Sequence, residues 1–191
     1  MTRVVCLLGS PREGGNSDQL AGRFCAAAKM HGAQTRTHSL RDLRFQGYVD
    51  LNGAAGQFGS DDDLAPVLSD VEDADVLVLA TPIYFCNVTG LMKQALDRFF
   101  AFFVSDYLTA DVPSRLGTNR TLVLAQTQGE VADKYETLLE DYSPAFDKLG
   151  FTNRYLLRAA EVREPSDIFT RTDVLEEADL LARRIVLGND G

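Results

Sequence analysis

The chain has 191 residues, of which 45% are hydrophobic and 25% charged, with a formal net charge of −9. This length suits one domain over residues 1–191, and the acidic balance argues against nucleic-acid or anionic-membrane partners, which require clustered Lys and Arg. No apolar run approaches the roughly 18 residues of a membrane span, and the start Met1-Thr2-Arg3 lacks a signal peptide's apolar core, so we expect a cytoplasmic protein with no membrane partner.

Short apolar runs alternate with segments of helical periodicity, as in a parallel sheet covered by helices on both faces. The predicted elements are a strand at 3–9, a helix at 17–31, a strand at 34–39, a helix at 63–72, a strand at 75–80, a helix from 89 into the phenylalanine-rich stretch 99–103, a strand at 120–126, a helix at 131–149, a strand at 152–160 and a helix at 171–187. The strand at 34–39 is mostly polar, which predicts an edge position. Strict alternation with right-handed crossovers predicts a three-layer, doubly wound α/β domain.

The loop at 9–17 follows the first strand and reads G-S-P-R-E-G-G-N-S. It leads into a helix N-terminus, where free backbone N–H groups and the positive end of the helix dipole favour an anion. It has neither the Gly-Lys-Ser/Thr of a Walker A loop nor the spacing of a dinucleotide fingerprint. Ser10, Arg12, Asn16 and Ser17 instead suit the terminal phosphate monoester of a mononucleotide.

The stretch from Leu40 to Asp63 is long and irregular, and it ends in the acidic triplet at 61–63. Loops of this length are uncommon in compact domains unless they are functional, so it either covers a site or subunit contact or is a surface loop. The triplet lies where a helix should begin, and the helix dipole favours carboxylates there without a metal. We therefore predict no metal site.

Two further loops complete the predicted pocket. The loop at 81–90 reads T-P-I-Y-F-C-N-V-T-G, in which Tyr84 and Phe85 supply flat apolar walls and backbone N–H groups enter the next helix. The loop at 126–130 contains Gly129, where backbone can approach a ligand closely. Ligands of open parallel sheets bind at the carboxyl ends of the strands where strand order reverses. These loops therefore predict a site for a mononucleotide with a flat heteroaromatic ring.

The motifs G-S-P-R-x-x-G-N-S and T-P-I-Y-F-x-x-V-T-G-x-x-K-x-x-L-D-R together resemble the NAD(P)H-dependent FMN reductase family, near the iron–sulfur flavoproteins, over most of residues 3–160. The resemblance implies a flavodoxin-like α/β/α sandwich with a five-stranded parallel sheet in the order 2-1-3-4-5, and a homodimer or homotetramer. By position it implies that Ser10, Arg12, Asn16 and Ser17 bind the FMN phosphate, that Pro82, Ile83, Tyr84, Phe85 and Asn87 line the ring, and that Thr127 and Gly129 contact its edge. The cysteine cluster of the iron–sulfur members is missing from 45–63, so no cluster is expected.

The implied function is FMN-dependent electron transfer from NADH or NADPH to a small acceptor such as a flavin or quinone. The cofactor carries this chemistry, so we predict no catalytic side chain. The alternative is a flavodoxin-like electron carrier, whose acidity this chain shares. Arg12 favours the enzyme, because flavodoxins bind phosphate with Thr, Ser and Gly residues. The sequence leaves open the acceptor, the choice between NADH and NADPH, and dimer against tetramer.

Three other features have competing interpretations. Cys86 is predicted to fill space beside the ring, with a redox role as the alternative. Lys93, Asp97 and Arg98 are predicted to form ion pairs on a helix surface or a subunit contact. The phenylalanines in 99–103 cannot share one helix face, so they predict a homodimer interface, the alternative being cover by residues 106–119.

Overall fold

The computed structural model describes residues 1–47 and 62–188. The strands are β1 (Arg3–Leu8), β2 (Gln34–Ser39), β3 (Val76–Pro82), β4 (Thr121–Thr127) and β5 (Asn153–Ala159). The helices are α1 (Asn16–Met30), α2 (Ala65–Asp73), α3 (Gly90–Asp97), α4 (Leu138–Lys148) and α5 (Thr172–Leu187), with 3₁₀ helices η1 (Leu40–Asp42), η2 (Arg98–Phe102) and η3 (Asp167–Thr170).

The strands form one parallel sheet in the order β2-β1-β3-β4-β5. This confirms the predicted flavodoxin-like topology, including the edge position of the polar strand β2. The order reverses at β1, which pairs with β2 on one side and β3 on the other. The carboxyl ends of β1, β3 and β4 therefore meet at one edge of the sheet, as predicted for the site.

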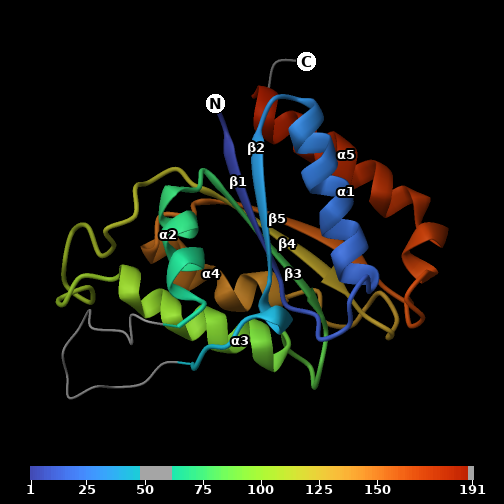
Figure 1. Cartoon of the computed structure of the whole chain (residues 1–191), viewed down its shortest axis with the longest axis horizontal. Coiled ribbons are helices and arrows are strands. Elements are labelled where there is room, and N and C mark those ends of the chain that lie inside the picture. Colours follow the sequence, from blue (N-terminus) through green and yellow to red (C-terminus); the bar gives the residue numbers. More distant parts are fainter. Residues whose placement is uncertain (48–61, 189–191) are drawn as a thin grey trace.

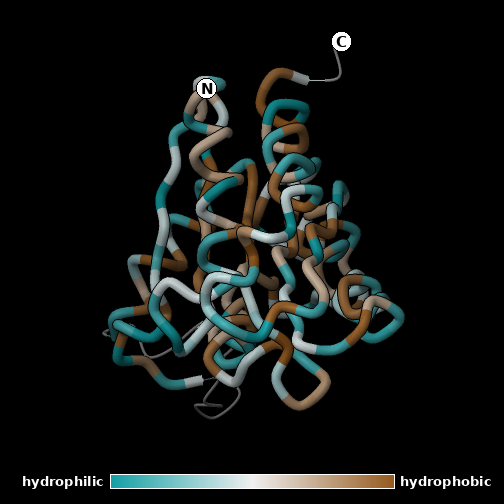
Figure 2. The backbone as a smooth tube through the Cα atoms, turned by 90° about the vertical axis from the view of Figure 1, so that its right-hand side faces the viewer, coloured by the Kyte–Doolittle hydropathy of each residue, from teal (hydrophilic) through white to brown (hydrophobic). Residues whose placement is uncertain are grey.

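Helices cover both faces of this sheet. Figure 1 shows α1 and α5 side by side on one face and α2, α3 and α4 on the other. Each face has its own buried core: Phe24 and Ala178 belong to the first, and Met92 and Phe102 belong to the second. In Figure 2 the backbone of α5, which leads to the C-terminus, alternates between hydrophilic and hydrophobic residues, as expected for a helix with one buried face.

The predicted helix at 131–149 is wrong in its first half, because α4 begins only at Leu138. Tyr135 adopts a left-handed backbone conformation with φ 59°, which interrupts a helix. Side chains from the sheet hold this segment instead: Gln128 Nε2 donates to the carbonyls of Val131 and Lys134, and Arg158 donates to those of Ala132 and Lys134.

The predicted helix through the phenylalanine-rich stretch is also corrected, since α3 ends at Asp97 and η2 continues to Phe102. Phe99 and Phe102 are buried, whereas 46% of Phe100 is exposed. The ring of Phe103 stacks on Tyr107 at a centroid distance of 4.8 Å. Residues 106–119 thus cover part of this cluster, as the alternative interpretation proposed.

Arg98 does not belong to a surface ion-pair set. Lys93 and Asp97 form the predicted exposed pair, with Nζ and Oδ1 2.5 Å apart. The Arg98 side chain is buried, and its Nη1 donates to Asp62 Oδ2 at 2.5 Å and to the carbonyl of Gln46 at 3.0 Å. Burial removes this arginine from water, so it requires such partners.

Two predictions lie partly or wholly beyond what the structure describes. The stretch 40–63 is described only at 40–47 and 62–63, so the proposed cover of a site or subunit contact lies outside the described residues. The prediction of a single domain over 1–191 stays a prediction. Within residues 1–47 and 62–188, no helix has the length and apolar character needed to cross a membrane.

Candidate functional site

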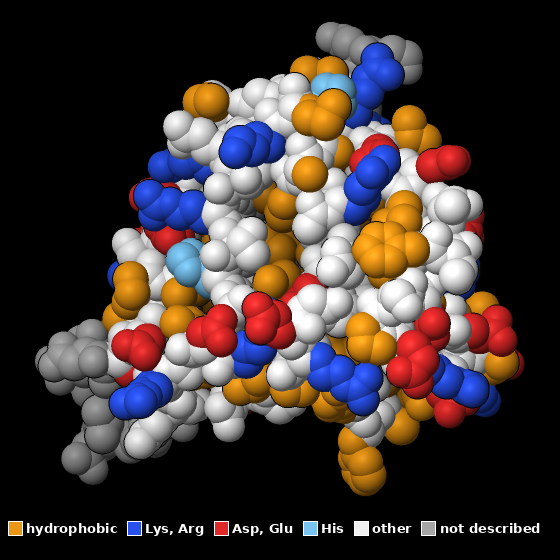
Figure 3. All heavy atoms as spheres, turned by 45° about the vertical axis from the view of Figure 1, so that its right-hand side comes forward, with side chains coloured by type: hydrophobic (Ala, Val, Ile, Leu, Met, Phe, Trp, Pro, Cys, Tyr) orange, Lys and Arg blue, Asp and Glu red, His pale blue; other side chains and the backbone are white. Residues whose placement is uncertain are grey.

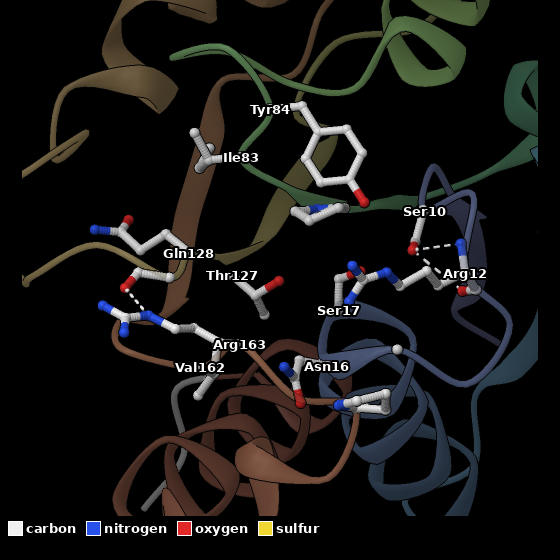
Figure 4. Close-up of a pocket in the computed structure, with 14 residues that line it drawn as sticks. Ser10, Arg12, Asn16, Ser17, Ile83, Tyr84, Thr127, Gln128, Val162 and Arg163 are labelled. Atoms are coloured by element: carbon white, nitrogen blue, oxygen red, sulfur yellow. Dashed lines mark hydrogen bonds between the residues drawn. The ribbon is translucent and has the colours of Figure 1, made fainter.

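A pocket opens where β1, β3 and β4 end (Figure 4). It is lined by Ser10, Arg12, Gly15, Asn16, Ser17, Pro82, Ile83, Tyr84, Thr127, Gln128, Gly129, Val162, Arg163 and Pro165. All the predicted site residues are among them except Phe85 and Asn87. The three predicted loops therefore converge on one cavity.

The first loop is fixed to its neighbours at Gly9. Its N–H donates to the carbonyl of Ala80 on β3 at 2.8 Å, and its carbonyl accepts a 2.6 Å hydrogen bond from the hydroxyl of Thr89. Thr89 also caps α3 by accepting from the N–H of Met92. A Cβ atom at Gly9 would lie only 2.8 Å from the Cβ of Met92, so glycine is required for α3 to approach the loop this closely.

The N-terminus of α1 presents unpartnered donors to the pocket. Gly15 is the N-cap, no side chain caps the helix, and the first backbone N–H groups have no intrahelical partner. Ser17 is 1% exposed, and its Oγ has no hydrogen-bond partner. Buried hydroxyls are normally hydrogen-bonded, so an orphaned one that lines a pocket indicates a ligand acceptor.

Two other predicted phosphate residues are already engaged in the loop. The Ser10 hydroxyl accepts from the N–H of Arg12 and lies 3.1 Å from its carbonyl. The Asn16 amide donates to the carbonyl of Glu164 at 2.8 Å and accepts from the N–H of Ile168 at 3.1 Å. Asn16 thus ties the loop to η3, and its amide has less capacity for a ligand than its sequence position implied.

The Arg12 guanidinium supplies a positive charge to this pocket wall. In Figure 4 its side chain extends from the loop toward Ser17, across the side of the pocket that Ser10 borders. The residue is exposed. A guanidinium in this position can donate two parallel hydrogen bonds to a phosphate.

Behind the loop lies a carboxylate that the sequence did not single out. Asp18 Oδ2 accepts from Arg41 Nη1 at 2.9 Å and from the N–H of Gly14 at 3.1 Å. Burial raises the pKa of Asp18 above its ordinary value, while Arg41 and the Gly14 N–H act in the opposite direction. The net direction is upward because desolvation of the carboxylate outweighs its partners.

The second loop makes a tight turn at the edge of the pocket. Tyr84 and Asn87 exchange backbone hydrogen bonds of 2.9 and 3.1 Å, and Phe85 and Cys86 between them have left-handed backbones with φ 49° and 65°. Phe85 is fully exposed and is not among the residues that line the main cavity. It borders a neighbouring hollow with Cys86, Tyr135 and Glu130.

Asn87 and Cys86 lie differently from their predicted places beside a ring. Asn87 Oδ1 accepts hydrogen bonds from the N–H of the next residue, Val88, and from the hydroxyl of Tyr142, both at 2.7 Å. Cys86 is exposed, and its Sγ lies 3.7 Å from the Tyr135 hydroxyl. Neither side chain lines the main cavity, and Cys86 borders the neighbouring hollow instead.

Sequence reasoning missed the wall formed after β5, which consists of Val162, Arg163 and Pro165. Arg163 Nε donates to the carbonyl of Gly129 at 3.0 Å, and its Cγ lies 3.1 Å from a Cβ built at Gly129. The rule that found the other loops could have found this one, since it also follows a strand's carboxyl end.

The acidic triplet has structural partners where it is described. Asp62 accepts from Arg98 and from the N–H of Leu64, and Asp63 accepts from the N–H of Arg44. Burial acts against the charge of Asp62, but hydrogen bonding and attraction from Arg98 hold its pKa below the ordinary value. Asp61 lies outside the described residues. In 1–47 and 62–188, His, Cys, Asp and Glu form no group of three able to hold a metal.

The family model for NADPH-dependent FMN reductases matches residues 2–134, which is more than half of the chain. The chain belongs to this family. Among curated relatives, YwqN of Bacillus subtilis, provisionally named an NAD(P)H-dependent FMN-containing oxidoreductase, is 25% identical over 184 residues, covering 95% of this chain and 97% of the relative. An iron–sulfur flavoprotein of Methanocaldococcus jannaschii is 30% identical over 98 residues, covering 50% of this chain and 51% of the relative.

Solved structures share the fold of this FMN reductase family member. An FMN-dependent NADH-azoreductase from Bacillus anthracis, in complex with FMN, superposes with a TM-score of 0.74 at 15% identity, covering 97% of this chain and 100% of that one. An NAD(P)H:quinone oxidoreductase from Methanothermobacter marburgensis gives a TM-score of 0.75 at 17% identity, covering 96% of each chain. These similarities confirm the flavodoxin-like fold.

Membership of the FMN reductase family confirms the predicted oxidoreductase, with FMN as cofactor and a nicotinamide nucleotide as electron donor. The flavodoxin-like carrier was the alternative, and family membership favours the enzyme over it.

Proposed function

We propose that the pocket at the ends of β1, β3 and β4 holds FMN, with the phosphate at the N-terminus of α1 and the ring beside Tyr84. The observation that carries this proposal is the buried Ser17 Oγ, which lacks a partner next to the uncapped start of α1. The acceptor is proposed to be a small molecule that receives the electrons of NADH or NADPH at this site.

The phosphate end of the pocket fits a dianion. The α1 N-terminus carries the positive end of the helix dipole, and Ser17 Oγ and the Arg12 guanidinium add a hydroxyl donor and a positive charge. Ser10 and Asn16 contribute chiefly by shaping the loop, because their side chains bond within the protein. Arg12, Ser17 and the N-terminus of α1 would bind the phosphate and neutralise its charge.

The opposite end fits a flat ring. In Figure 4, Tyr84 and Ile83 lie above Thr127 and Gln128, and all four residues line the pocket. Gly129 lies where a side chain would press against Arg163. Apolar walls with a few polar groups are typical of a site that holds an aromatic ligand in one orientation.

The chemistry that bound FMN supplies is redox transfer between a nicotinamide donor and a second substrate. The protein's part is to bind the cofactor, to orient its ring and to leave the ring accessible to the second substrate. In the turn at 83–87, the N–H groups of Ile83, Tyr84 and Asn87 already bond to backbone carbonyls. The proposed donor to the ring edge is therefore the N–H of Gly129, which lines the pocket and would favour charge that grows there during reduction. No side chain is required to act as acid or base.

The site lies at an accessible edge of the molecule. On the face shown in Figure 3, hydrophobic side chains gather along the lower edge, and acidic and basic groups are interspersed above them. Tyr84 is 42% exposed and Phe85 fully exposed, which supports entry of a small aromatic acceptor beside them. Together with the exposed Phe100, these two residues also support the predicted homodimer or homotetramer. The oligomeric state stays a prediction. The cytoplasmic location and the absence of nucleic-acid partners also stay predictions.

The proposal is tested by adding FMN to the cofactor-free protein and reducing the complex anaerobically with NADH and, separately, NADPH. We expect a yellow protein that either nucleotide bleaches at a catalytic rate, followed by reoxidation with a quinone, azo compound or free flavin. A yellow protein reduced only through a partner reductase would instead indicate the electron carrier. A protein that takes up no FMN would refute the proposed site.

Arg12→Ala tests the phosphate end directly. It should weaken FMN by about 1.5–3 kcal/mol, the scale of a charge-assisted hydrogen bond, and should leave riboflavin, which lacks the phosphate, almost unaffected. Fluorescence titration of each flavin measures this. Arg36→Ala is the matched control, since Arg36 on β2 pairs with Asp70 on α2. Equal FMN affinity in Arg12→Ala and the native chain would show that Arg12 does not contact the phosphate.

A further inference from the structure

A largely buried ion pair contacts the loop at 9–17. It joins Arg41 of η1 to Asp18 of α1, with Nη1 and Oδ2 2.9 Å apart. The Arg41 side chain is 15% exposed and that of Asp18 is 7% exposed. Neither residue is among those that line the pocket.

The pair holds the loop at three places. Arg41 Nη1 donates to the carbonyl of Ser10 at 3.1 Å and to that of Arg12 at 3.4 Å. Asp18 Oδ2 accepts from the N–H of Gly14 at 3.1 Å, at the residue whose φ of 64° turns the chain toward α1. Arg41 Nη2 also donates to Ser39 Oγ, which connects the loop to the end of β2.

Stability alone does not account for this arrangement. Burial raises the pKa of Asp18, so keeping the carboxylate charged costs folding free energy despite Arg41. Its second oxygen, Oδ1, is buried without a hydrogen-bond partner. Glu13 adds a further negative charge nearby. By charge alone, Asp18 should also repel a phosphate at the start of α1.

We infer that Arg41 and Asp18 are positioning residues that fix the backbone of residues 10–14, so that Arg12, Ser17 and the first N–H groups of α1 face one phosphate. This inference rests on the proposed FMN pocket. The pair acts through the loop and not through a contact with the ligand. Its expected signature is therefore a loss of phosphate recognition without a loss of ring binding.

The test measures the dissociation constants of FMN and riboflavin for the full chain, and the inhibition of FMN binding by inorganic phosphate. In the native chain we expect FMN to bind more tightly than riboflavin and phosphate to compete with FMN. Arg41→Met and Asp18→Ala should each weaken FMN about tenfold or more, the scale of a lost charge-assisted hydrogen bond, with riboflavin unchanged within about twofold. Unchanged riboflavin binding also shows that the variants fold.

Asp18→Ala separates the positioning effect from the charge effect, because the two change FMN affinity in opposite directions. Removing a negative charge near the phosphate predicts tighter FMN binding, whereas loss of the brace predicts weaker binding. Arg41→Lys keeps the positive charge without the fork of donors, so it should behave like Arg41→Met. Arg36→Met is the control for removing an arginine near β2, because Arg36 pairs with Asp70 away from the loop; it should leave both affinities unchanged.

Two outcomes overturn the inference. One is tighter FMN binding in Asp18→Ala, and the other is an unchanged ratio of riboflavin to FMN dissociation constants in both Asp18→Ala and Arg41→Met. Failure of the proposed function looks different, because then the native chain itself would not prefer FMN to riboflavin. If a variant loses both flavins equally, the pair supports the fold and not the phosphate site, which also refutes the inference.

Discussion

The two main walls of the pocket are built in opposite ways. The loop at 9–17 is held by Thr89, Arg41, Asp18 and the packing of Met92, and Ser10 and Ser17 within it are buried. The turn at 84–87 is closed by its own two backbone hydrogen bonds, and its two central residues are exposed with left-handed backbones.

The difference matches the two ends of the proposed ligand. A phosphate is recognised by donors at fixed positions, so its loop must be rigid before binding. A redox-active ring must be held while one face stays open to a second substrate, so its wall can project into solvent. The comparison predicts that changes in the first loop affect stability and phosphate binding, and that changes in the turn affect stability little.

The largest effect is expected at Gly9. Gly9→Ala places a methyl group 2.8 Å from the Cβ of Met92, and such overpacking should lower the free energy of unfolding by about 1–3 kcal/mol. Urea denaturation measures the change. Gly22→Ala is the matched control, because nothing lies within 4 Å of its added Cβ on α1, and it should raise stability by about 0.5–1 kcal/mol. Similar small changes in the free energy of unfolding for both variants would contradict the tight packing inferred for the loop at 9–17.

A smaller and more selective effect is expected at Ser17. Ser17→Ala removes a buried hydroxyl that has no partner in the protein, so stability should be unchanged or slightly raised while FMN binding weakens by about 1–2 kcal/mol. Riboflavin affinity should not change. Parallel urea and flavin titrations measure both quantities. A fall in stability without a fall in FMN affinity would mean that the hydroxyl serves the fold.

The smallest effect is expected in the turn. Phe85→Gly removes a fully exposed ring at a left-handed position, so it should raise the free energy of unfolding by up to about 1 kcal/mol. Leu108→Gly, at a similarly exposed residue without a left-handed backbone, should lower it slightly. If Phe85→Gly destabilises the protein as much as Gly9→Ala, the turn at 84–87 contributes as much to stability as the loop at 9–17, and the contrast between the two walls is wrong.

Much of the fold was predictable because its signals are local. The apolar strands β1, β3 and β4 and the polar edge strand β2 follow from short-range patterns. The predicted helix start at 131 failed because the side chains of Gln128, just after β4, and Arg158 of β5 bond the carbonyls of residues 131–134. No pattern within that segment reports a partner as distant along the chain as Arg158.

The sequence by itself determined the fold class, the family resemblance and the three loops of the pocket, because each strand-loop-helix unit carries its own signal. Only the tertiary structure decided what the side chains do. It engaged Ser10 and Asn16 within the protein, turned Phe85 and Asn87 out of the cavity, and left Ser17 unpartnered. It also brought Arg41 behind the loop, next to Asp18. Hydrogen-bond partners of a buried group come from distant segments, so their identity is settled only when the chain has folded.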